Sequence, residues 1–177
     1  VDRLEDKMKL IELCLTMAYD AKVNYTDVLG SVRYWDVLIY NHLREKNIVI
    51  PQKVNKEKAE QFEGAYVKDP QVGMHKWVMS FDLNSLYPHL IMQYNISPET
   101  LLPSKKQDGL VNKILEGKVK NTTKHCMTPN GAFFRKDKRG FLPELMEGMY
   151  NDRVKYKKLM LQAEQEYENT KDKSLLK

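Results

Sequence analysis

The chain lacks several features that would place it in particular protein classes. It has two cysteines among 177 residues, and they do not form a Cys-x-x-Cys pair. This excludes a disulfide framework and fits a reducing compartment. No run of about 18 apolar residues occurs, so the sequence predicts no membrane span. Of the four histidines only His125 lies beside a cysteine, which is too few ligands for a zinc site.

The composition provides enough apolar residues for a core and a mild excess of positive charge. The apolar fraction is 42%, the charged fraction is 30% and the formal net charge is +5 at pH 7. A positive balance of this size permits a polyanionic partner but does not demand one. Composition alone therefore leaves nucleic-acid binding open.

Residue patterns predict an α+β fold in which helices surround a small sheet. Helices are predicted over 3–23, 31–46 and 142–170, where apolar residues recur at helical spacing, and short helices over 85–94 and 108–116. Ser31 is expected to cap the second of these helices. β-forming residues predict a strand over 76–82, which precedes the helix over 85–94, and two short strands around the turn at 129–131. Residues 95–103 are expected to form a turn region.

The stretch FDLNSLYPHL, residues 81–90, raises the first functional question. The apolar run ends at Asp82, shortly before a helix is expected to begin. Because Asn84 and Ser85 can each cap that helix, one interpretation is a plain α+β protein in which Asp82 is a turn residue. The alternative interpretation uses the same geometry. A carboxylate at a strand end suits Mg²⁺, and the free N–H groups of a helix start suit phosphate oxygens.

A second candidate feature lies on the helix predicted over 142–170. Arg153 and Lys157 are four residues apart, so they share one face of that helix. A guanidinium and an ammonium on one face can bind phosphate groups. A solvated basic face has the same spacing, so this pattern alone does not decide between the two interpretations.

Together these residues resemble the DNA polymerases of family B. DLNSLYPHLI (82–91) is similar to the first palm motif of that family, and QYNISPETL (93–101) resembles its continuation in T-even-type bacteriophage replicative polymerases. FEGAYV (62–67) resembles the segment before the palm, and GFLPELMEGMYNDRVKYKK (140–158) resembles the start of the fingers. LEDKMKLIEL (4–13) is similar to the segment after the third exonuclease motif. The resemblance runs along nearly the whole chain in the family's order.

The resemblance implies template-directed nucleotidyl transfer from a dNTP to a primer 3′-hydroxyl. Asp82 would be catalytic and, with the carbonyl of Leu83, would coordinate the two Mg²⁺ ions. Tyr87 would be the steric gate that rejects a ribose 2′-hydroxyl. The residues implied for nucleotide binding are Asn84, Ser85, Leu86, Tyr87, Arg153 and Lys157. The residues implied for contacts with DNA are Phe62, Gly64, Ala65 and Tyr66.

The resemblance also implies a domain organisation and partners. Residues 1–50 would be the helical segment after the exonuclease domain, residues 51–139 the first part of the palm, and residues 140–177 the first fingers helix. The partners would be primer–template DNA, dNTP and the rest of a polymerase, with a sliding clamp as a further candidate. For a phage-encoded protein, the location would be the cytoplasm of the host.

Departures from the family pattern limit what the chain is expected to do alone. His89 stands where the family usually has serine, a change that we expect to be tolerated. The 177 residues contain neither the Asp-Thr-Asp motif nor the second fingers helix, Lys-x-x-x-Asn-Ser-x-Tyr-Gly. We therefore expect a polymerase fragment, or one part of a split polymerase, that is inactive alone. The competing hypothesis is a non-catalytic module that binds nucleotide or DNA.

Overall fold

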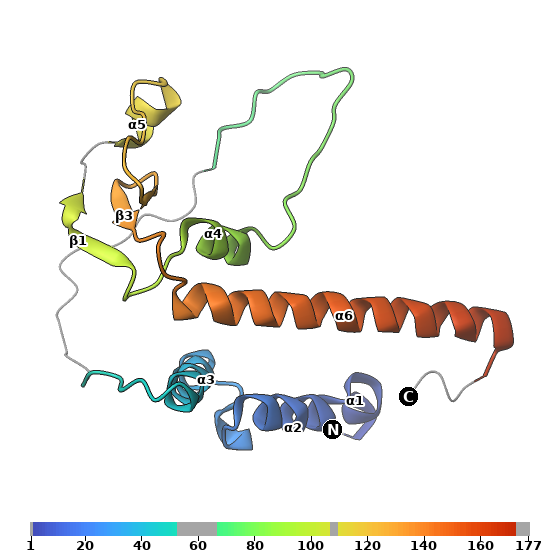
Figure 1. Cartoon of the computed structure of the whole chain (residues 1–177). Coiled ribbons are helices and arrows are strands. Elements are labelled where there is room, and N and C mark those ends of the chain that lie inside the picture. The colour runs from blue at the N-terminus through green and yellow to red at the C-terminus, as the bar shows by residue number, and fades with distance from the viewer. Residues whose placement is uncertain (1, 53–66, 107–109, 173–177) are drawn as a thin grey trace. The chain divides into compact units, whose positions relative to one another are not determined.

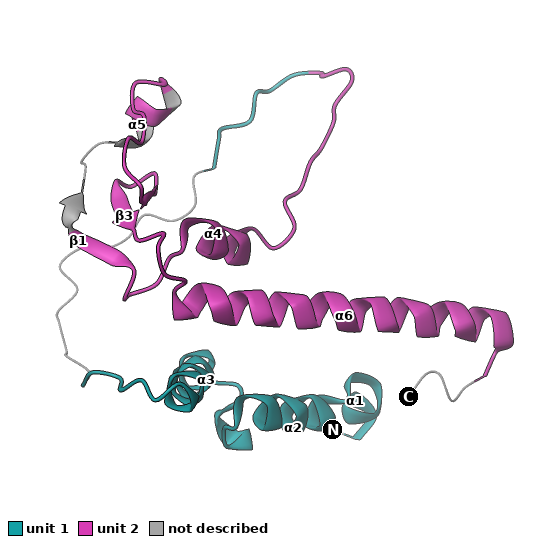
Figure 2. Cartoon of the chain, in the orientation of Figure 1, with its two compact units in different colours: residues 1–73 teal, residues 74–177 magenta. Residues whose placement is uncertain are grey.

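A computed structural model describes residues 2–52, 67–106 and 110–172 of the chain (Figure 1). The chain divides into two compact units, unit 1 over residues 1–73 and unit 2 over residues 74–177 (Figure 2). Helices are combined with a small antiparallel sheet, which confirms the α+β class. The three-part domain division stays a prediction. None of the helices in the described ranges combines the length and apolar character that a membrane crossing requires.

Unit 1 consists of helices joined by short turns. In chain order its elements are α1 (Asp2–Met8), α2 (Leu10–Ala21), the 3-10 helix η1 (Tyr25–Asp27) and α3 (Ser31–Glu45). The single helix predicted over 3–23 is divided, because Lys9 has a left-handed backbone conformation with φ of 52°. Gly30, and not Ser31 as predicted, occupies the N-cap position of α3, and no side chain caps that helix.

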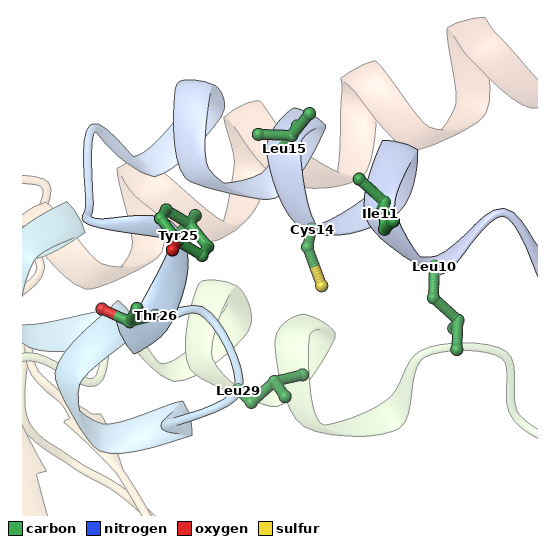
Figure 3. Close-up of a pocket in the computed structure, with 7 residues that line it drawn as sticks. All are labelled: Leu10, Ile11, Cys14, Leu15, Tyr25, Thr26 and Leu29. Atoms are coloured by element: carbon green, nitrogen blue, oxygen red, sulfur yellow. The ribbon is translucent and has the colours of Figure 1, made fainter. Parts of the chain in front are cut away.

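The apolar face of α2 is only partly covered within unit 1. Ala18 and Ala21 are buried, whereas Ile11 is 61% exposed. The physical reason is that α2 contacts η1 and α3 in this unit, and these elements cover only part of its surface. A pocket of about 520 Å³ remains open between α2 and the η1 turn (Figure 3). It is lined by Leu10, Ile11, Cys14, Leu15, Tyr25, Thr26 and Leu29.

Unit 2 contains the predicted helices and a three-stranded sheet. Its helices are α4 (Leu86–Tyr94), α5 (Leu110–Leu115) and α6 (Phe141–Thr170). They confirm the helices predicted over 85–94, 108–116 and 142–170. The short α4 lies alongside α6 and contacts it (Figure 1). Pro143 is tolerated because the first turn of a helix does not use its N–H groups internally.

The sheet of unit 2 is antiparallel, with the strand order β1-β3-β2. Its strands are β1 (Leu101–Lys106), β2 (Cys126–Met127) and β3 (Ala132–Phe134). The strands β2 and β3 confirm the pair predicted around residues 129–131. Strand β1 was not predicted, since Leu101 and the residues before it were expected to form a turn. Leu101 pairs with Phe134, so β1 forms through a distant partner rather than through its local pattern.

The strand predicted over 76–82 does not form. This segment is irregular, since Trp77 has a left-handed φ of 59°, and its apolar side chains are exposed, with Trp77 at 98% and Phe81 at 85%. A strand requires a neighbour that pairs with its backbone N–H and C=O groups. In the part of the chain that the structure describes, no strand lies beside this segment. The pattern therefore identified residues suited to a sheet but not the partner that a strand needs.

Gly140, immediately before α6, is packed too tightly for a side chain. A Cβ at this position would lie 2.5 Å from the Cβ of Ser97 and 3.2 Å from Cγ2 of Thr100. Both neighbours are themselves buried. We expect Gly140→Ala to lower the free energy of unfolding by roughly 1–3 kcal/mol, because overpacking forces the backbone to shift. Urea denaturation followed by circular dichroism measures this change.

Gly148→Ala is the matched control for this substitution. Gly148 lies within α6, and a Cβ there would meet nothing within 4 Å. Alanine is favoured over glycine in a helix interior by up to about 1 kcal/mol, so this variant should be more stable than the original chain. Similar destabilisation by both substitutions would contradict the packing explanation.

Candidate functional site

Asp82 lies in the irregular segment that leads into α4, four residues before the helix begins. Its side chain is exposed, and no hydrogen bond or ion pair engages it within the described residues. The neighbouring Leu83 is 70% exposed. A carboxylate and a backbone carbonyl are oxygen ligands that suit Mg²⁺. They form only part of a ligand set, because the described residues contain no group of three His, Cys, Asp or Glu side chains that could hold a metal.

The N-terminus of α4 differs from the prediction in how it is capped. Ser85 occupies the N-cap position, yet no side chain caps the helix, so the cap expected from Asn84 or Ser85 is wrong. The reason is the left-handed conformation of Ser85, with φ of 54°. Capping side chains usually belong to residues with extended backbone geometry, from which they reach the N–H groups of the first turn. These N–H groups are therefore not occupied by a capping side chain.

Ser85 instead connects α4 to α6. Arg153 Nη1 donates a hydrogen bond to Ser85 Oγ over 2.7 Å, between residues 68 positions apart in the sequence. Two residues that were predicted to bind nucleotide are therefore in direct contact. Their approach also explains why the Ser85 hydroxyl is engaged away from the helix that it precedes.

His89 supports the same contact one turn further along α4. Its Nδ1 lies 2.9 Å from the backbone carbonyl oxygen of Ser85. Its ring meets the ring of Tyr150 on α6 edge to face, with 4.7 Å between the centroids. The residue that departs from the family pattern thus packs between α4 and α6. Whether the change from serine is tolerated stays a prediction.

The other predicted nucleotide-binding residues are exposed around this contact. Tyr87 is 73% exposed and Leu86 is 43% exposed in the first turn of α4. Lys157 is exposed one turn beyond Arg153 on α6. No described hydrogen bond or ion pair joins these side chains to the Ser85–Arg153 contact. The residues predicted to contact DNA, which are Phe62, Gly64, Ala65 and Tyr66, lie outside the described residues.

Asn95 connects the end of α4 to the segment that leads into α6, a role that was not predicted from the sequence. Its Nδ2 donates to the backbone oxygens of Arg135 (2.6 Å) and Lys138 (2.8 Å), and its Oδ1 accepts the N–H of Gly140 (2.9 Å). The side chain is buried, and the backbone closes α4 in a left-handed conformation with φ of 55°. An asparagine directly after a predicted helix is a known signal for such a left-handed end, so this part could have been found.

Glu99 provides a second connection to the start of α6. Its Oε1 accepts a hydrogen bond from the N–H of Phe141 over 2.7 Å, and Ser97 Oγ donates to its Oε2. A carboxylate at a helix N-terminus also interacts favourably with the helix dipole. Asn95 and Glu99 together place the start of α6 against the end of α4. The position of Arg153, about three turns later, follows from that placement.

Comparison with known proteins matches residues 30–174 to DNA polymerase family B. The chain is 36% identical over 170 residues to a DNA-directed DNA polymerase of Escherichia phage RB69, which covers 96% of this chain and 19% of that protein. It is 35% identical over 167 residues to a DNA-directed DNA polymerase of Enterobacteria phage T4, with coverages of 94% and 18%. A DNA polymerase of Pyrococcus horikoshii is 32% identical over 139 residues, with coverages of 76% and 10%. The chain thus spans about a fifth of the length of the two phage relatives.

Proposed function

Because the chain belongs to DNA polymerase family B, we propose that it supplies the first metal-binding carboxylate and part of the nucleotide site of a template-directed DNA polymerase. The observation that carries this proposal is the hydrogen bond between Arg153 and Ser85. It joins two segments that were expected, on separate motifs, to bind the same nucleotide. The contact supports a shared site because neither segment's local pattern requires the other.

In the proposed reaction, the primer 3′-hydroxyl is joined to the incoming nucleotide and pyrophosphate leaves. Asp82 and the carbonyl of Leu83 would hold Mg²⁺, which when bound would activate the hydroxyl and neutralise the leaving group. The uncapped N–H groups at the start of α4 would receive phosphate oxygens. Lys157 would pair with the triphosphate, and Tyr87 would exclude the 2′-hydroxyl of a ribonucleotide.

The contact between Arg153 and Ser85 suggests how the phosphates would be bound. A guanidinium group has five N–H donors, and the bond to Ser85 uses one of them. The others would remain available for bidentate hydrogen bonds to a phosphate group. Because Ser85 already holds the guanidinium at the start of α4, less side-chain freedom would be lost on binding. The positive end of the helix and the arginine would then act on the same anion.

We further propose that catalysis requires a second metal-binding carboxylate from outside these 177 residues. The sequence contains no Asp-Thr-Asp motif, and one carboxylate does not hold two Mg²⁺ ions productively. The missing groups would come from a longer form of the chain or from a complementary polypeptide with the second fingers helix. Primer–template DNA and dNTP are the substrates in this proposal, while a sliding clamp and the host cytoplasm stay predictions.

A second candidate function is a non-catalytic module that binds nucleotide or DNA. It is favoured by the partial ligand set at Asp82, since phosphate binding by α4 and α6 does not require a complete metal site. The two functions differ in what Asp82 contributes. In the enzyme it is indispensable for extension, whereas in the binding module its loss has little effect.

Mixing this chain with a polypeptide that carries the Asp-Thr-Asp motif, the second fingers helix and the thumb tests the proposed function. We expect Mg²⁺-dependent primer extension from dNTP. In that mixture Tyr87→Ala should raise the use of rNTP relative to dNTP by roughly 10- to 100-fold, because space opens beneath the sugar. The ratio of the two kcat/KM values measures this change.

Tyr19→Ala is the control for the loss of an exposed tyrosine, because Tyr19 is 82% exposed on α2. It should leave the ratio unchanged. An unaltered ratio in Tyr87→Ala would refute the gate assignment. Absence of extension at every stoichiometry would refute the proposal that the chain works as one part of a split polymerase.

A further inference from the structure

The positive charge of the chain is concentrated in one short segment of unit 2. Residues 117–140 contain seven lysines and arginines and a single acid, Asp137, which gives a net charge of +6. The whole chain has a net charge of +5, so the remaining residues carry 22 basic and 23 acidic side chains. The segment comprises β2, β3 and the loops on either side of them. No predicted site residue lies within it.

Ion pairs divide the cations of this segment into two groups. The paired cations are Lys118 with Glu116, Arg135 with Asp137, and Arg139 with Glu147. The other four are exposed and have no ion-pair partner among the residues that the structure describes. We call them the hairpin lysines: Lys120, Lys124, Lys136 and Lys138. Their charge is therefore not offset by carboxylates in the described part of the fold.

The fold brings two of the hairpin lysines, Lys124 and Lys136, to the open end of the β2–β3 hairpin. Cys126 pairs with Phe134, so the chain entering β2 and the chain leaving β3 start from the same end of this strand pair. Lys124 lies two residues before Cys126, and Lys136 lies two residues after Phe134. We call the segment before β2 and the segment after β3 the two arms of the hairpin. The antiparallel register thus places cations from both arms at one end of the hairpin.

The two arms remain near each other beyond the paired residues. The hydrogen bond from Arg135 lowers the pKa of the Asp137 carboxyl to about 2, and His125 on the other arm adds a smaller effect of the same sign. Asp137 is therefore ionised at neutral pH and is neutralised by Arg135. The one acid of the segment consequently does not offset the charge of the hairpin lysines.

Both arms are braced by side-chain hydrogen bonds to the backbone. Asn95 donates to the carbonyl oxygens of Arg135 and Lys138, and Asn121 Nδ2 donates to the carbonyl oxygen of His125 over 2.7 Å. These hydrogen bonds hold the backbone that carries the lysine side chains in place. A ligand then orders the side chains alone, which lowers the entropic cost of binding.

We propose that the hairpin lysines form a binding surface for the phosphate backbone of duplex DNA. Four exposed ammonium groups in the two segments that flank the hairpin, without carboxylate partners among the described residues, create the positive potential that attracts a polyanion. Lysine contacts position a duplex through its phosphates without reading its sequence. The choice of a primer–template duplex as the ligand rests on the proposed polymerase function. None of the hairpin lysines is among the residues predicted to contact DNA or nucleotide.

Fluorescence anisotropy of the 177-residue chain with a fluorescein-labelled DNA duplex, at a series of salt concentrations, tests this inference. The logarithm of affinity falls by about 0.9 per phosphate contact for each unit of log salt concentration. We expect replacement of all four hairpin lysines by glutamine to weaken binding at low salt by roughly tenfold or more and to reduce the slope by about 3–4. Lys136→Gln alone should reduce the slope by about 1.

A control variant with glutamine at four exposed lysines elsewhere removes the same net charge. Its substituted positions are Lys7, Lys68, Lys76 and Lys171. It should lose much less affinity than the hairpin variant. Equal losses in the two variants, an unchanged slope in Lys136→Gln, or no salt-dependent binding by the original chain would each overturn the proposal. Circular dichroism tests whether the two quadruple variants are folded. If either is unfolded, the salt slope of Lys136→Gln decides the question.

This measurement is independent of catalysis, because it requires neither Mg²⁺ nor primer extension. A mixture that fails to extend a primer while the hairpin variant loses DNA affinity would refute the split-polymerase proposal and support the DNA surface. A mixture that extends a primer while the hairpin variant binds DNA normally would overturn only the DNA surface.

Discussion

Replacing Asp82 by alanine is expected to abolish primer extension by a polymerase assembled around this chain, with a loss of roughly 1000-fold or more. A catalytic metal ion contributes several kcal/mol of charge stabilisation in the transition state, and each 1.36 kcal/mol corresponds to about tenfold in rate. The described residues offer no carboxylate cluster that could replace Asp82. DNA affinity should barely change, because the carboxylate would act on the metal and not on the duplex. Single-turnover extension and fluorescence anisotropy measure the two quantities separately.

Asp69→Ala is the matched control, because Asp69 is also an exposed aspartate outside the helices and strands. It should alter neither extension nor DNA affinity. Full extension by the Asp82→Ala enzyme would contradict the metal-binding role and would favour the non-catalytic module. A parallel loss of DNA affinity and extension would instead indicate that Asp82 supports the fold of the DNA-binding surface.

Replacing Asn95 by alanine is expected to lower the free energy of unfolding by roughly 3–5 kcal/mol. The substitution leaves the carbonyls of Arg135 and Lys138 and the N–H of Gly140 without their side-chain partner. The buried N–H of Gly140 costs about 1–3 kcal/mol when it is unsatisfied, and alanine in a left-handed conformation adds about 1–2 kcal/mol. The carbonyls of Arg135 and Lys138 belong to exposed residues, so they can bind water and add less. The sum is a large part of the stability of a small protein, which is typically about 5–15 kcal/mol. Urea denaturation measures the total, and hydrogen exchange of the first turn of α6 localises it.

Asn47→Ala separates the hydrogen bonds from the backbone effect. Asn47 follows α3 with the same left-handed φ of 55°, but it is exposed, and no side-chain hydrogen bond engages it in the described part of the chain. Its replacement should therefore cost only the backbone penalty of about 1–2 kcal/mol. Asn95→Gly removes the side-chain hydrogen bonds without the backbone penalty, because glycine adopts this conformation freely. If Asn95→Gly were as stable as the original chain, the hydrogen bonds of Asn95 would not be what holds α4 and α6 together.

Whether a predicted element was observed depended on whether it forms through local or long-range interactions. The helix over 142–170 was predicted because its apolar residues recur at helical spacing, which is a local property. The strand over 76–82 was predicted on residue type and does not form, because pairing requires a neighbouring strand. The cap at Ser85 failed for a related reason. Local sequence indicated a capping hydroxyl, but that hydroxyl instead binds Arg153, 68 positions away.

The sequence by itself determined the class of the fold, the positions of most helices and the membership of the polymerase family. These depend on residue spacing and on motifs that occur in a fixed order along the chain. Only the tertiary structure decided that Arg153 meets Ser85, that buried Asn95 binds the segment before α6, and that Lys124 and Lys136 lie at one end of β2 and β3. Each of these is a contact between distant segments. Its geometry depends on how whole helices and strands pack, which no local pattern specifies.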